Sequence, residues 1–460
     1  MGRSLESRFE RYSDRMVEAL GHADRTTPGR WYLQGLVLPG QRKSVEPMAA
    51  RVHPQNVRSA HQSMHHLVAA ADWSDTALLK AVADEVVPAL SRKGQAACFW
   101  ILDDTGCRKY GKQSVGVARQ YCGQLGKTDN CQVAVSLSLA TADGSLPLDY
   151  RLYLPQEWID DPQRCERAGI PEGITFLTKG EIAWAQIEAA LVAGIPRGPV
   201  LMDAGYGDEA ALRDRLITAG LSYAVGIKPA TAVWWDFYQP AIAPTSQIRG
   251  RPRTRVLRDD AHQPIGVLKL AQCLPVAAYQ TITWREGTNA PLKSRFARVR
   301  VRAAHGDRPR DEEWLLIEWP EGEDKPTRYF LSNLPADIPF KELVAIVKMR
   351  WRIERDYREL KQEVGLGHYE GRNWRGFHHH ASLCIAAYGF LMLERLCGSK
   401  KNGARFKAPP VPEGFLPRGA GADAATRTLV DRKRTLSPGS EHRQKSSAVP
   451  VLRQTVRAGI

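Results

Sequence analysis

The spacing of apolar positions predicts helices throughout the first 93 residues. Apolar residues recur there at helical intervals, and the alternation typical of strands does not occur. Helices are predicted over residues 5–20, 54–70 and 74–90. Ser74 or Asp75 is placed to cap the third helix, because a short polar side chain there can accept from a free backbone N–H group. We therefore expect this part of the chain to form a helical domain.

From residue 97 the pattern changes to apolar runs of strand length separated by helical segments. Strands are predicted over 97–103, 131–140, 146–154, 199–203 and 222–227, with helices over 179–193 and 209–219. A Gly- and Lys-rich loop is expected over 106–126, and the hairpin dipeptide Asp143-Gly144 is expected to join the second and third strands. This β-β-β-α-β-α-β order predicts an α/β domain with an RNase H-like fold, a mixed sheet flanked by helices.

A basic, β-rich segment is predicted to interrupt this core before two long helices, 340–364 and 377–396, complete it. Alternating runs such as Arg-Val-Arg-Val-Arg at 298–302 indicate strands in the inserted segment. The Gly-, Pro-, Ser- and Arg-rich composition near the end of the sequence predicts disorder. The expected domains are an N-terminal helical, DNA-binding domain (1–93), the first part of the catalytic core (94–228), a β-rich insertion (229–335), the second part of the core (336–397) and a basic tail (398–460).

Composition limits the class of protein. The 460 residues allow two or three domains with a substantial core. No apolar stretch of the roughly 20 residues needed to span a bilayer is apparent, and the first residues lack the apolar core of a signal peptide. The eight cysteines form no Cys-x-x-Cys pair, so neither a zinc ribbon nor a disulfide framework is indicated. We expect a cytoplasmic protein without a membrane partner.

The positive charge is concentrated in two blocks, which indicates a polyanionic partner. The net charge is +15, and residues 398–460 contain 13 Lys or Arg against 4 Asp or Glu. Residues 249–310 contain 14 basic residues against 4 acidic ones. Concentrated blocks of this kind are typical of surfaces that follow nucleic acid phosphates. A basic tail with no partner is the alternative for the first block. Loop 39–44 and the His-rich helix after it are also suited to contact DNA, although a helical bundle without a binding role fits them almost as well.

Three carboxylates far apart in the sequence are the main candidates for catalysis. Asp103 and Asp203 each end a predicted buried strand, and Glu354 lies in the helix predicted over 340–364. Such residues cannot form a local salt bridge, so only a fold can bring them together. Two Asp and one Glu can bind a pair of divalent cations, the arrangement that cuts and joins phosphodiester bonds.

Arg350, Glu354 and Lys361 fall along one side of this helix, beside its apolar stripe. A surface Arg–Glu pair, with a stabilisation of a few tenths of a kcal/mol, is the alternative interpretation. Asp104 adjoins Asp103, and only one of two neighbouring strand residues can point into a given site. Asp208 is expected to cap the following helix. The run His378-His379-His380 lacks spaced partners and is expected to be solvated or to face DNA rather than to bind metal.

These motifs resemble those of the DDE transposases of bacterial insertion sequences. The segments Ile-Leu-Asp-Asp-Thr-Gly at 101–106 and Val-Leu-Met-Asp-Ala-Gly-Tyr at 200–206 are similar to the first two motifs of that family. Within the family, the chain resembles the insertion-sequence-four clan and, most closely, its seven-hundred-one branch. The block 114–121 is also similar to that branch. The third motif of the clan has the form Tyr-x2-Arg-x3-Glu-x6-Lys. The Arg, Glu and Lys positions are present here, whereas Val347 occupies the Tyr position.

The resemblance implies metal-dependent DNA cleavage at the ends of an insertion sequence, followed by strand transfer into target DNA. It implies that Asp103, Asp203 and Glu354 are catalytic and hold two Mg²⁺ ions, for which Mn²⁺ can substitute. Arg350 and Lys361 would bind DNA phosphates. The implied partners are the terminal inverted repeats and target DNA, with a protein homodimer in the synaptic complex.

Two alternative functions remain open on the sequence alone. One is an RNase H-like nuclease that cuts DNA without joining ends. The other is a catalytically inactive DNA-binding protein derived from a transposase, and the unusual composition of residues 420–460 is compatible with such a decayed copy. A glycosidase with paired carboxylates is disfavoured, because it would leave the two basic blocks unexplained.

Overall fold

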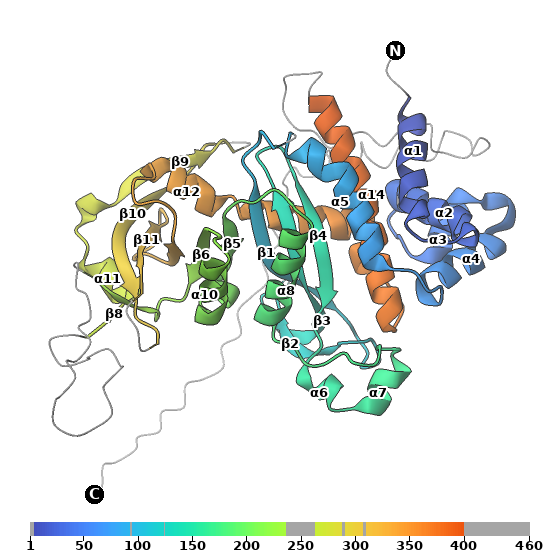
Figure 1. Ribbon diagram of the computed structural model, residues 1–460, viewed down its shortest axis with the longest axis horizontal. Helices are drawn as coiled ribbons and strands as arrows, with labels where there is room; N and C mark the ends of the chain where they lie inside the picture. The colour runs from blue at the N-terminus through green and yellow to red at the C-terminus, as the bar shows by residue number, and fades with distance from the viewer. Residues whose placement is uncertain are drawn as a thin grey trace, which may run out of the picture. The chain divides into compact units, whose positions relative to one another are not determined.

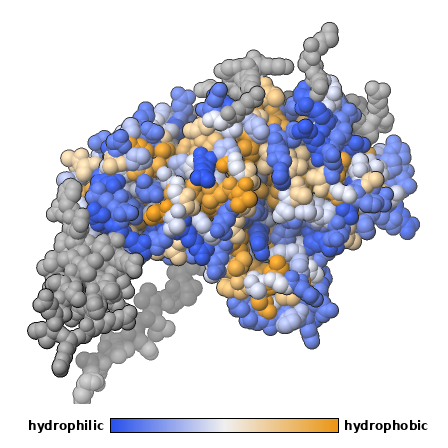
Figure 2. Space-filling model, viewed as in Figure 1, coloured by the Kyte–Doolittle hydropathy of each residue, from blue (hydrophilic) through white to orange (hydrophobic). Residues whose placement is uncertain are grey.

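The computed structural model describes residues 4–92, 94–123, 125–235, 263–287, 290–306 and 310–399, all within one compact unit, Met1–Phe415. The first part is helical, as predicted, and contains α1 (Leu5–Glu18), α2 (Thr26–Val37), α3 (Val45–Val52), α4 (Val57–Ala69) and α5 (Asp75–Leu90) (Figure 1). Ser74 caps α5 by accepting from the backbone N–H of Ala77 at 3.1 Å. In Figure 2 the N-terminal helices present mainly hydrophilic residues, because their apolar sides pack inward. Of the tail predicted as disordered over 398–460, residues 398 and 399 end the last helix, and the remainder lies outside the described residues.

Helix α2 was not predicted, because it contains Gly29 and Gly35, which disfavour a helix. Both glycines lie at close contacts with neighbouring helices. A Cβ atom at Gly35 would come within 2.8 Å of Met48, and one at Gly29 would come within 2.9 Å of Val17 and Leu20. Close packing therefore overrides the local preference of these residues.

The core sheet has the expected RNase H-like topology. Its strands are β1 (Phe99–Arg108), β2 (Ala118–Cys122), β3 (Lys127–Ala140), β4 (Ser145–Leu152), β5 (Val200–Met202) and β6 (Tyr223–Ile227). Strand β3 pairs antiparallel with both β1 and β4, whereas β5 lies parallel to β1 and to β6. Two short helices, α6 (Gln156–Ile159) and α7 (Pro162–Arg167), follow β4, and α8 (Lys179–Val192), α9 (Ala204–Gly207) and α10 (Ala210–Thr218) lie between the later strands. Residues 106–126, predicted as a loop, contain the last part of β1 and all of β2.

Residues 229–335 are rich in strands, as predicted, but these strands extend the same sheet. The described elements are β7 (Ala232–Trp234), β8 (Ile265–Gly266), α11 (Val267–Cys273), β9 (Gln280–Arg285), β10 (Leu292–Ala303), β11 (Glu312–Trp319) and β12 (Arg328–Ser332). Strand β12 pairs antiparallel with β6, and the order continues β12-β11-β10-β7-β8. The fully buried strand β6 therefore joins the core to the inserted segment.

The single helix predicted over 340–364 is wrong, because the chain forms two helices and a wider turn there. These are α12 (Phe340–Lys348), α13 (Trp351–Glu359) and a π-helical turn, Leu360–Val364, which ends at Gly365 with φ 88°. Between α12 and α13, the N–H groups of Arg352 and Ile353 bond to carbonyls only three residues back. This tighter turn departs from α-helical geometry at Arg350. The side chain of Arg350 forms an ion pair with Asp103 of the core sheet.

The last helix, α14 (Trp374–Ser399), lies beside α5 and packs on β4 (Figure 1). Contrary to the sequence-based expectation, Trp374–Gly398 is long and apolar enough to cross a membrane, with a mean hydropathy of 1.3. More than half of it (61%) is buried inside the protein, as in the core helix of a globular domain. Its contacts therefore explain its apolar composition.

The histidine run on α14 is buried, so the expectation that it is solvated or DNA-facing is wrong. His378, His379 and His380 are each at most 7% exposed. The ring of His380 lies between Tyr32 Oη, at 2.8 Å from Nδ1, and the carbonyl of Gly365, at 3.0 Å from Nε2. A neutral ring satisfies both contacts, because Nδ1 can accept from the tyrosine while Nε2–H donates to the carbonyl. This residue therefore links α2 to α14.

Burial of His380 predicts that acid lowers the stability of the fold. Burial lowers the pKa of His380 to about 4, whereas an exposed histidine has a pKa near 6.5. The unfolded chain thus takes up a proton below about pH 6.5 that the folded chain takes up only near pH 4, so stability falls as pH decreases across this window. We expect His380→Gln to reduce the fall in unfolding free energy between pH 6.5 and 4 by up to about 3 kcal/mol, measured by urea unfolding.

The control for this prediction is His65→Gln, because His65 is exposed on α4. This variant should keep the pH dependence of the parent protein. If the unfolding free energy of His380→Gln depended on pH as that of the parent protein does, the assignment of a buried neutral ring would be contradicted.

Candidate active site

All five residues predicted for the site line one cleft of about 980 Å³. The cleft is bounded by β1, by the end of β2, by the start of α8, by the segment after β5 and by α13 with its following turn. The five residues are Asp103, Asp203, Arg350, Glu354 and Lys361. Segments separated by 100 residues or more in the sequence therefore meet at one place.

Parallel pairing brings Asp103 and Asp203 to matching positions. Strands β1 and β5 pair Trp100 with Val200 and Ile101 with Leu201. Continued by two residues, this register aligns the two aspartates on neighbouring strands, which lie about 5 Å apart in a sheet. Asp103 was expected to end its strand, but β1 continues to Arg108. The cleft opens at Asp103 because β5, its parallel neighbour, ends at Met202.

Asp203 begins α9 and accepts two backbone hydrogen bonds with one of its oxygens. The N–H groups of Gly205 and Tyr206 donate to its Oδ1, at 2.8 and 3.3 Å. Asp208, which was expected to cap the next helix, instead accepts from Thr231 at 2.6 Å and pairs with Lys228 at 3.2 Å. The loop after β5 is thus fixed by the backbone contacts of Asp203 itself.

Asp103 is partly buried, with 14% of its side chain accessible, and forms an ion pair with Arg350. The guanidinium Nη1 donates to Asp103 Oδ2 at 2.8 Å. Burial raises the pKa of Asp103 to about 7; Arg350 opposes this shift, and the neighbouring carboxylates Asp203 and Asp104 add to it. A carboxylate in this position requires a cation to remain charged. Arg350 therefore acts as the internal counterion of the cleft.

Asp104 has a separate partner on α8. Its Oδ2 lies 2.5 Å from Lys179 Nζ. Both aspartates line the cleft, although only one of two neighbouring strand residues was expected to point into it. They differ in their partners, since Asp103 pairs with Arg350 and Asp104 with Lys179. The structure thus places Asp103, rather than Asp104, against Arg350.

Glu354 is the most exposed of the three predicted carboxylates, with 69% of its side chain accessible. Its Oε1 lies 4.0 Å from Arg350 Nη2, so Arg350 lies between Glu354 and Asp103. The surface Arg–Glu pair considered from the sequence is therefore present, but the arginine is also bound to the core sheet. Arg350 was predicted to bind a DNA phosphate, and in this structure its guanidinium is bound to carboxylates.

Lys361 lies in the turn after α13, and its ammonium donates to the carbonyl of Gly106 on β1 at 2.8 Å. The π-helical turn places it on the cleft wall although the predicted continuous helix is absent. The contact ties the end of this helical segment to the strand that carries Asp103.

Two polar residues that the sequence analysis did not select hold α13 against the sheet. Tyr357 Oη lies 2.7 Å from Ser136 Oγ on β3, in a buried position. Asp356 is 2% exposed, and it accepts from Tyr388 at 2.9 Å as well as from Ser145. Polar residues on the apolar side of α13 were the available sequence signal, because buried polar groups usually have partners.

The donor set of the cleft fits a hard divalent cation. Within the described residues, no three His, Cys, Asp or Glu side chains are placed as a ready-made metal-binding group. Asp103, Asp203 and Glu354 nevertheless offer only carboxylate oxygens, which Mg²⁺ prefers. The exposed side chain of Glu354 can rotate, and Arg350 already balances the negative charge that a cation would neutralise.

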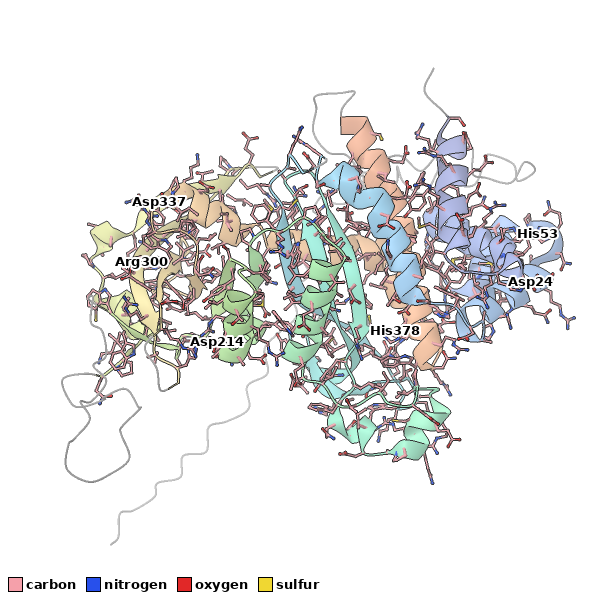
Figure 3. The ribbon with its side chains drawn as sticks, in the orientation of Figure 1. Asp24, His53, Asp214, Arg300, Asp337 and His378 are labelled. Carbon is pink, nitrogen blue, oxygen red and sulfur yellow. The ribbon has the colours of Figure 1, made fainter. Side chains whose placement is uncertain are left out.

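The arginines of β10 are used within the protein. Arg298 lies over the ring of Trp314, with 4.5 Å from its guanidinium carbon to the ring centroid. Arg300, labelled in Figure 3, pairs with Glu312 at 3.0 Å. The expectation that the internal basic block forms a free phosphate-binding surface is therefore wrong for these two residues. Residues 249–262 of that block lie outside the described residues.

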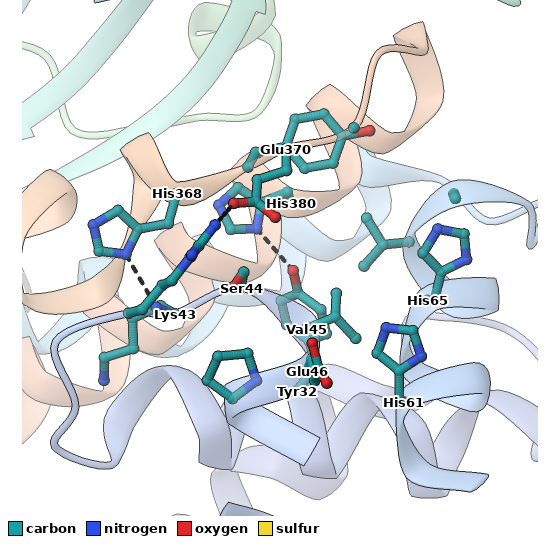
Figure 4. Close-up of a pocket in the computed structure, with 16 residues that line it drawn as sticks. Tyr32, Lys43, Ser44, Val45, Glu46, His61, His65, His368, Glu370 and His380 are labelled. Carbon is teal, nitrogen blue, oxygen red and sulfur yellow. Dashed lines mark hydrogen bonds and ion pairs between the residues drawn. The ribbon is translucent and has the colours of Figure 1, made fainter. Parts of the chain in front are cut away.

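The cations of loop 39–44 are also bound within the protein. This loop borders a second cavity of about 360 Å³, which is also lined by the start of α3 and by His380 (Figure 4). Lys43 is 2% exposed and donates to the carbonyls of Leu36 and Leu38, and burial lowers its pKa to about 8. The loop therefore serves to anchor the N-terminal helices.

The fold and the carboxylate-lined cleft define a protein of the RNase H-like class. The family model of the DDE superfamily endonucleases matches residues 15–291, more than half of the chain, so the chain belongs to this family. It is also similar to a probable transposase for insertion sequence element IS701 from Microchaete diplosiphon, with 25% identity over 340 residues. These residues cover 72% of this chain and 73% of the relative. The predicted resemblance to DDE transposases is confirmed. The family match includes Asp103 and Asp203 and ends before Glu354.

The buried contact of Tyr357 predicts a loss of stability when its hydroxyl is removed. Tyr357→Phe would leave Ser136 Oγ without this partner, and a buried hydrogen bond contributes about 1 kcal/mol. We expect the unfolding free energy to fall by about that amount in urea. Tyr110→Phe is the matched control, because Tyr110 is 91% exposed. Equal stabilities for the two variants would contradict the role given to Tyr357.

Proposed function

We propose that this protein is a transposase that cleaves DNA at the ends of an insertion sequence and joins the freed ends to target DNA. The observation that carries the proposal is the meeting of Asp103, Asp203 and Glu354 at one cleft, around the guanidinium of Arg350. The three carboxylates come from β1, from the residue that follows β5 and from a distant helix, so only the folded chain assembles them. Membership of the DDE endonuclease family supports the same conclusion.

Asp103, Asp203 and Glu354 would hold two Mg²⁺ ions, or Mn²⁺ in their place. When bound, such ions lower the pKa of a water molecule and neutralise charge on the attacking and leaving oxygens. Asp203 can contribute Oδ2, because its Oδ1 is occupied by backbone N–H groups. Arg350 and Lys361 would turn toward DNA phosphates as the cations take over the carboxylates. This chemistry requires no Ser or Tyr nucleophile.

The proposed partners are the terminal inverted repeats of the element and the target DNA. A net charge of +15 favours binding to both. Two ends must be held together during transposition, so we propose a homodimer in the synaptic complex. The protein would act in the cytoplasm, on nucleoid DNA, with the N-terminal helices and the inserted segment contacting the element ends.

The assignment of the site is tested by removing one carboxylate at a time. We expect Asp103→Asn, Asp203→Asn and Glu354→Gln each to lower the rate of Mg²⁺-dependent cleavage of a labelled element end at least about 100-fold, because several kcal/mol of charge stabilisation is lost. Binding of the same DNA in a gel-shift assay should change little. Chelation by EDTA should abolish cleavage by the parent protein, and Mg²⁺ or Mn²⁺ should restore it.

Asp208→Asn is the matched control, since Asp208 also follows β5 but is bound to Thr231 and Lys228. It should cleave at nearly the parental rate. Retained nicking in all three site variants would reject the assignment. Cleavage without joining would indicate a nuclease, and binding without cleavage by the parent protein would indicate an inactive derivative.

A further inference from the structure

Four basic side chains line the cleft, and they differ in whether another group of the protein accepts a hydrogen bond from them. Three have protein acceptors: Arg350 has Asp103, Lys179 has Asp104 and Lys361 has the carbonyl of Gly106. Arg358 lies one turn beyond Glu354 on α13, so that the two share one side of the helix. Arg358 is exposed, and its side chain makes no hydrogen bond or ion pair with the residues that the structure describes. It is thus the cleft cation that can bind a phosphate without first releasing a partner.

An exposed aromatic ring lies at the same cleft. Tyr121, near the end of β2, is 61% exposed and lines the cleft. Within the described part of the chain its side chain makes no hydrogen bond and no ring contact, although its backbone belongs to the β2–β3 pair. Exposing a large ring beside charged residues forgoes the stabilisation that burial would give. A ring in this setting is suited to stack on another flat group.

Packing of the next residue fixes the position of Tyr121. Cys122 is fully buried and packs with Cys131 and Val133. It lies so close to Gly106 that a Cβ atom there would come within 2.7 Å of Cys122 Sγ and 3.3 Å of its Cα atom. Because neighbouring side chains on a strand point in opposite directions, burying Cys122 directs Tyr121 outward. Gly106 also accepts from Lys361, so one residue links this hairpin to the helical wall of the cleft.

We propose that Tyr121 and Arg358 form a binding site for a nucleotide at a DNA strand end. Tyr121 stacks on an unpaired base, and Arg358 binds a phosphate of the same strand. The site rests on the proposed function, because it serves to hold DNA beside the carboxylates.

The two residue types match the two parts of a nucleotide that every DNA strand offers. Stacking of a base on an aromatic ring tolerates any base, since each base has a flat face. An arginine can donate two parallel hydrogen bonds to a phosphate. A base inside a duplex is covered on both faces by its neighbours, so the tyrosine favours an unpaired or terminal nucleotide.

Fluorescence anisotropy with two labelled duplexes of mixed sequence tests the role of Tyr121. One duplex is blunt and the other has a short single-stranded 3′ overhang, and EDTA is present so that no strand is cut. We expect the parent protein to bind the overhang duplex more tightly than the blunt one. Tyr121→Ala should weaken overhang binding about fivefold or more, the lower bound for stacking of one base. Tyr121→Phe should keep the preference, because it retains the ring.

Arg358→Ala should weaken binding of both duplexes and reduce the slope of log affinity against log salt by about one, as expected for the loss of one phosphate contact. Tyr110→Ala and Arg167→Ala are matched controls, because both residues are exposed and neither lines the cleft. Both controls should bind like the parent protein.

Equal affinities of Tyr121→Ala and the parent protein for the overhang duplex would overturn the proposal, as would an unchanged salt slope in Arg358→Ala. Either result would leave the proposed function intact, provided that the parent protein still cleaves the element end. Failure of the parent protein to bind either duplex would count against both.

Discussion

The ion pair between Arg350 and Asp103 is the contact on which the cleft depends. Asp103 lies on a buried strand, beside two further carboxylates, where burial and like charges both disfavour its ionised form. Arg350 supplies the opposite charge from a different part of the chain, and it also approaches Glu354. The helical segment departs from regular geometry at this residue. A site of this kind is held together by its arginine until divalent cations compete for the same oxygens.

The surrounding fold keeps this arrangement in place through contacts of a different kind. The parallel register of β1 and β5 sets the two aspartates side by side. Buried hydrogen bonds from Tyr357 and Asp356 hold α13, with its glutamate, against the sheet. Strand β6 continues the sheet into the inserted segment, whose arginines stabilise that segment through aromatic rings and carboxylates. Arginines of the inserted segment therefore take part in contacts within the protein. Composition alone could not distinguish such residues from basic residues that are free to bind a phosphate.

The sequence was most informative where apolar runs are regular. Such runs predicted the order of strands and helices in the core. Together with the motifs, they also indicated the candidate carboxylates and the family. Features decided by distant contacts were missed. Helix α2 contains glycines that only close packing explains. His379 and His380 of α14 are buried, and each has a ring nitrogen within hydrogen-bond distance of a backbone carbonyl outside α14. The break before α13 reflects an ion pair formed across 247 positions of the chain. Exposure of Tyr121 and Arg358 likewise depends on which neighbours the fold supplies.

The proposed metal site is tested most directly by a crystal structure determined with Mn²⁺, in which anomalous scattering locates the metal. We predict metal density in contact with oxygens of Asp103, Asp203 and Glu354, with the Arg350 guanidinium moved away from Asp103. Absence of metal from this cleft at saturating Mn²⁺, or metal bound elsewhere while the Arg350–Asp103 pair stays intact, would contradict the account.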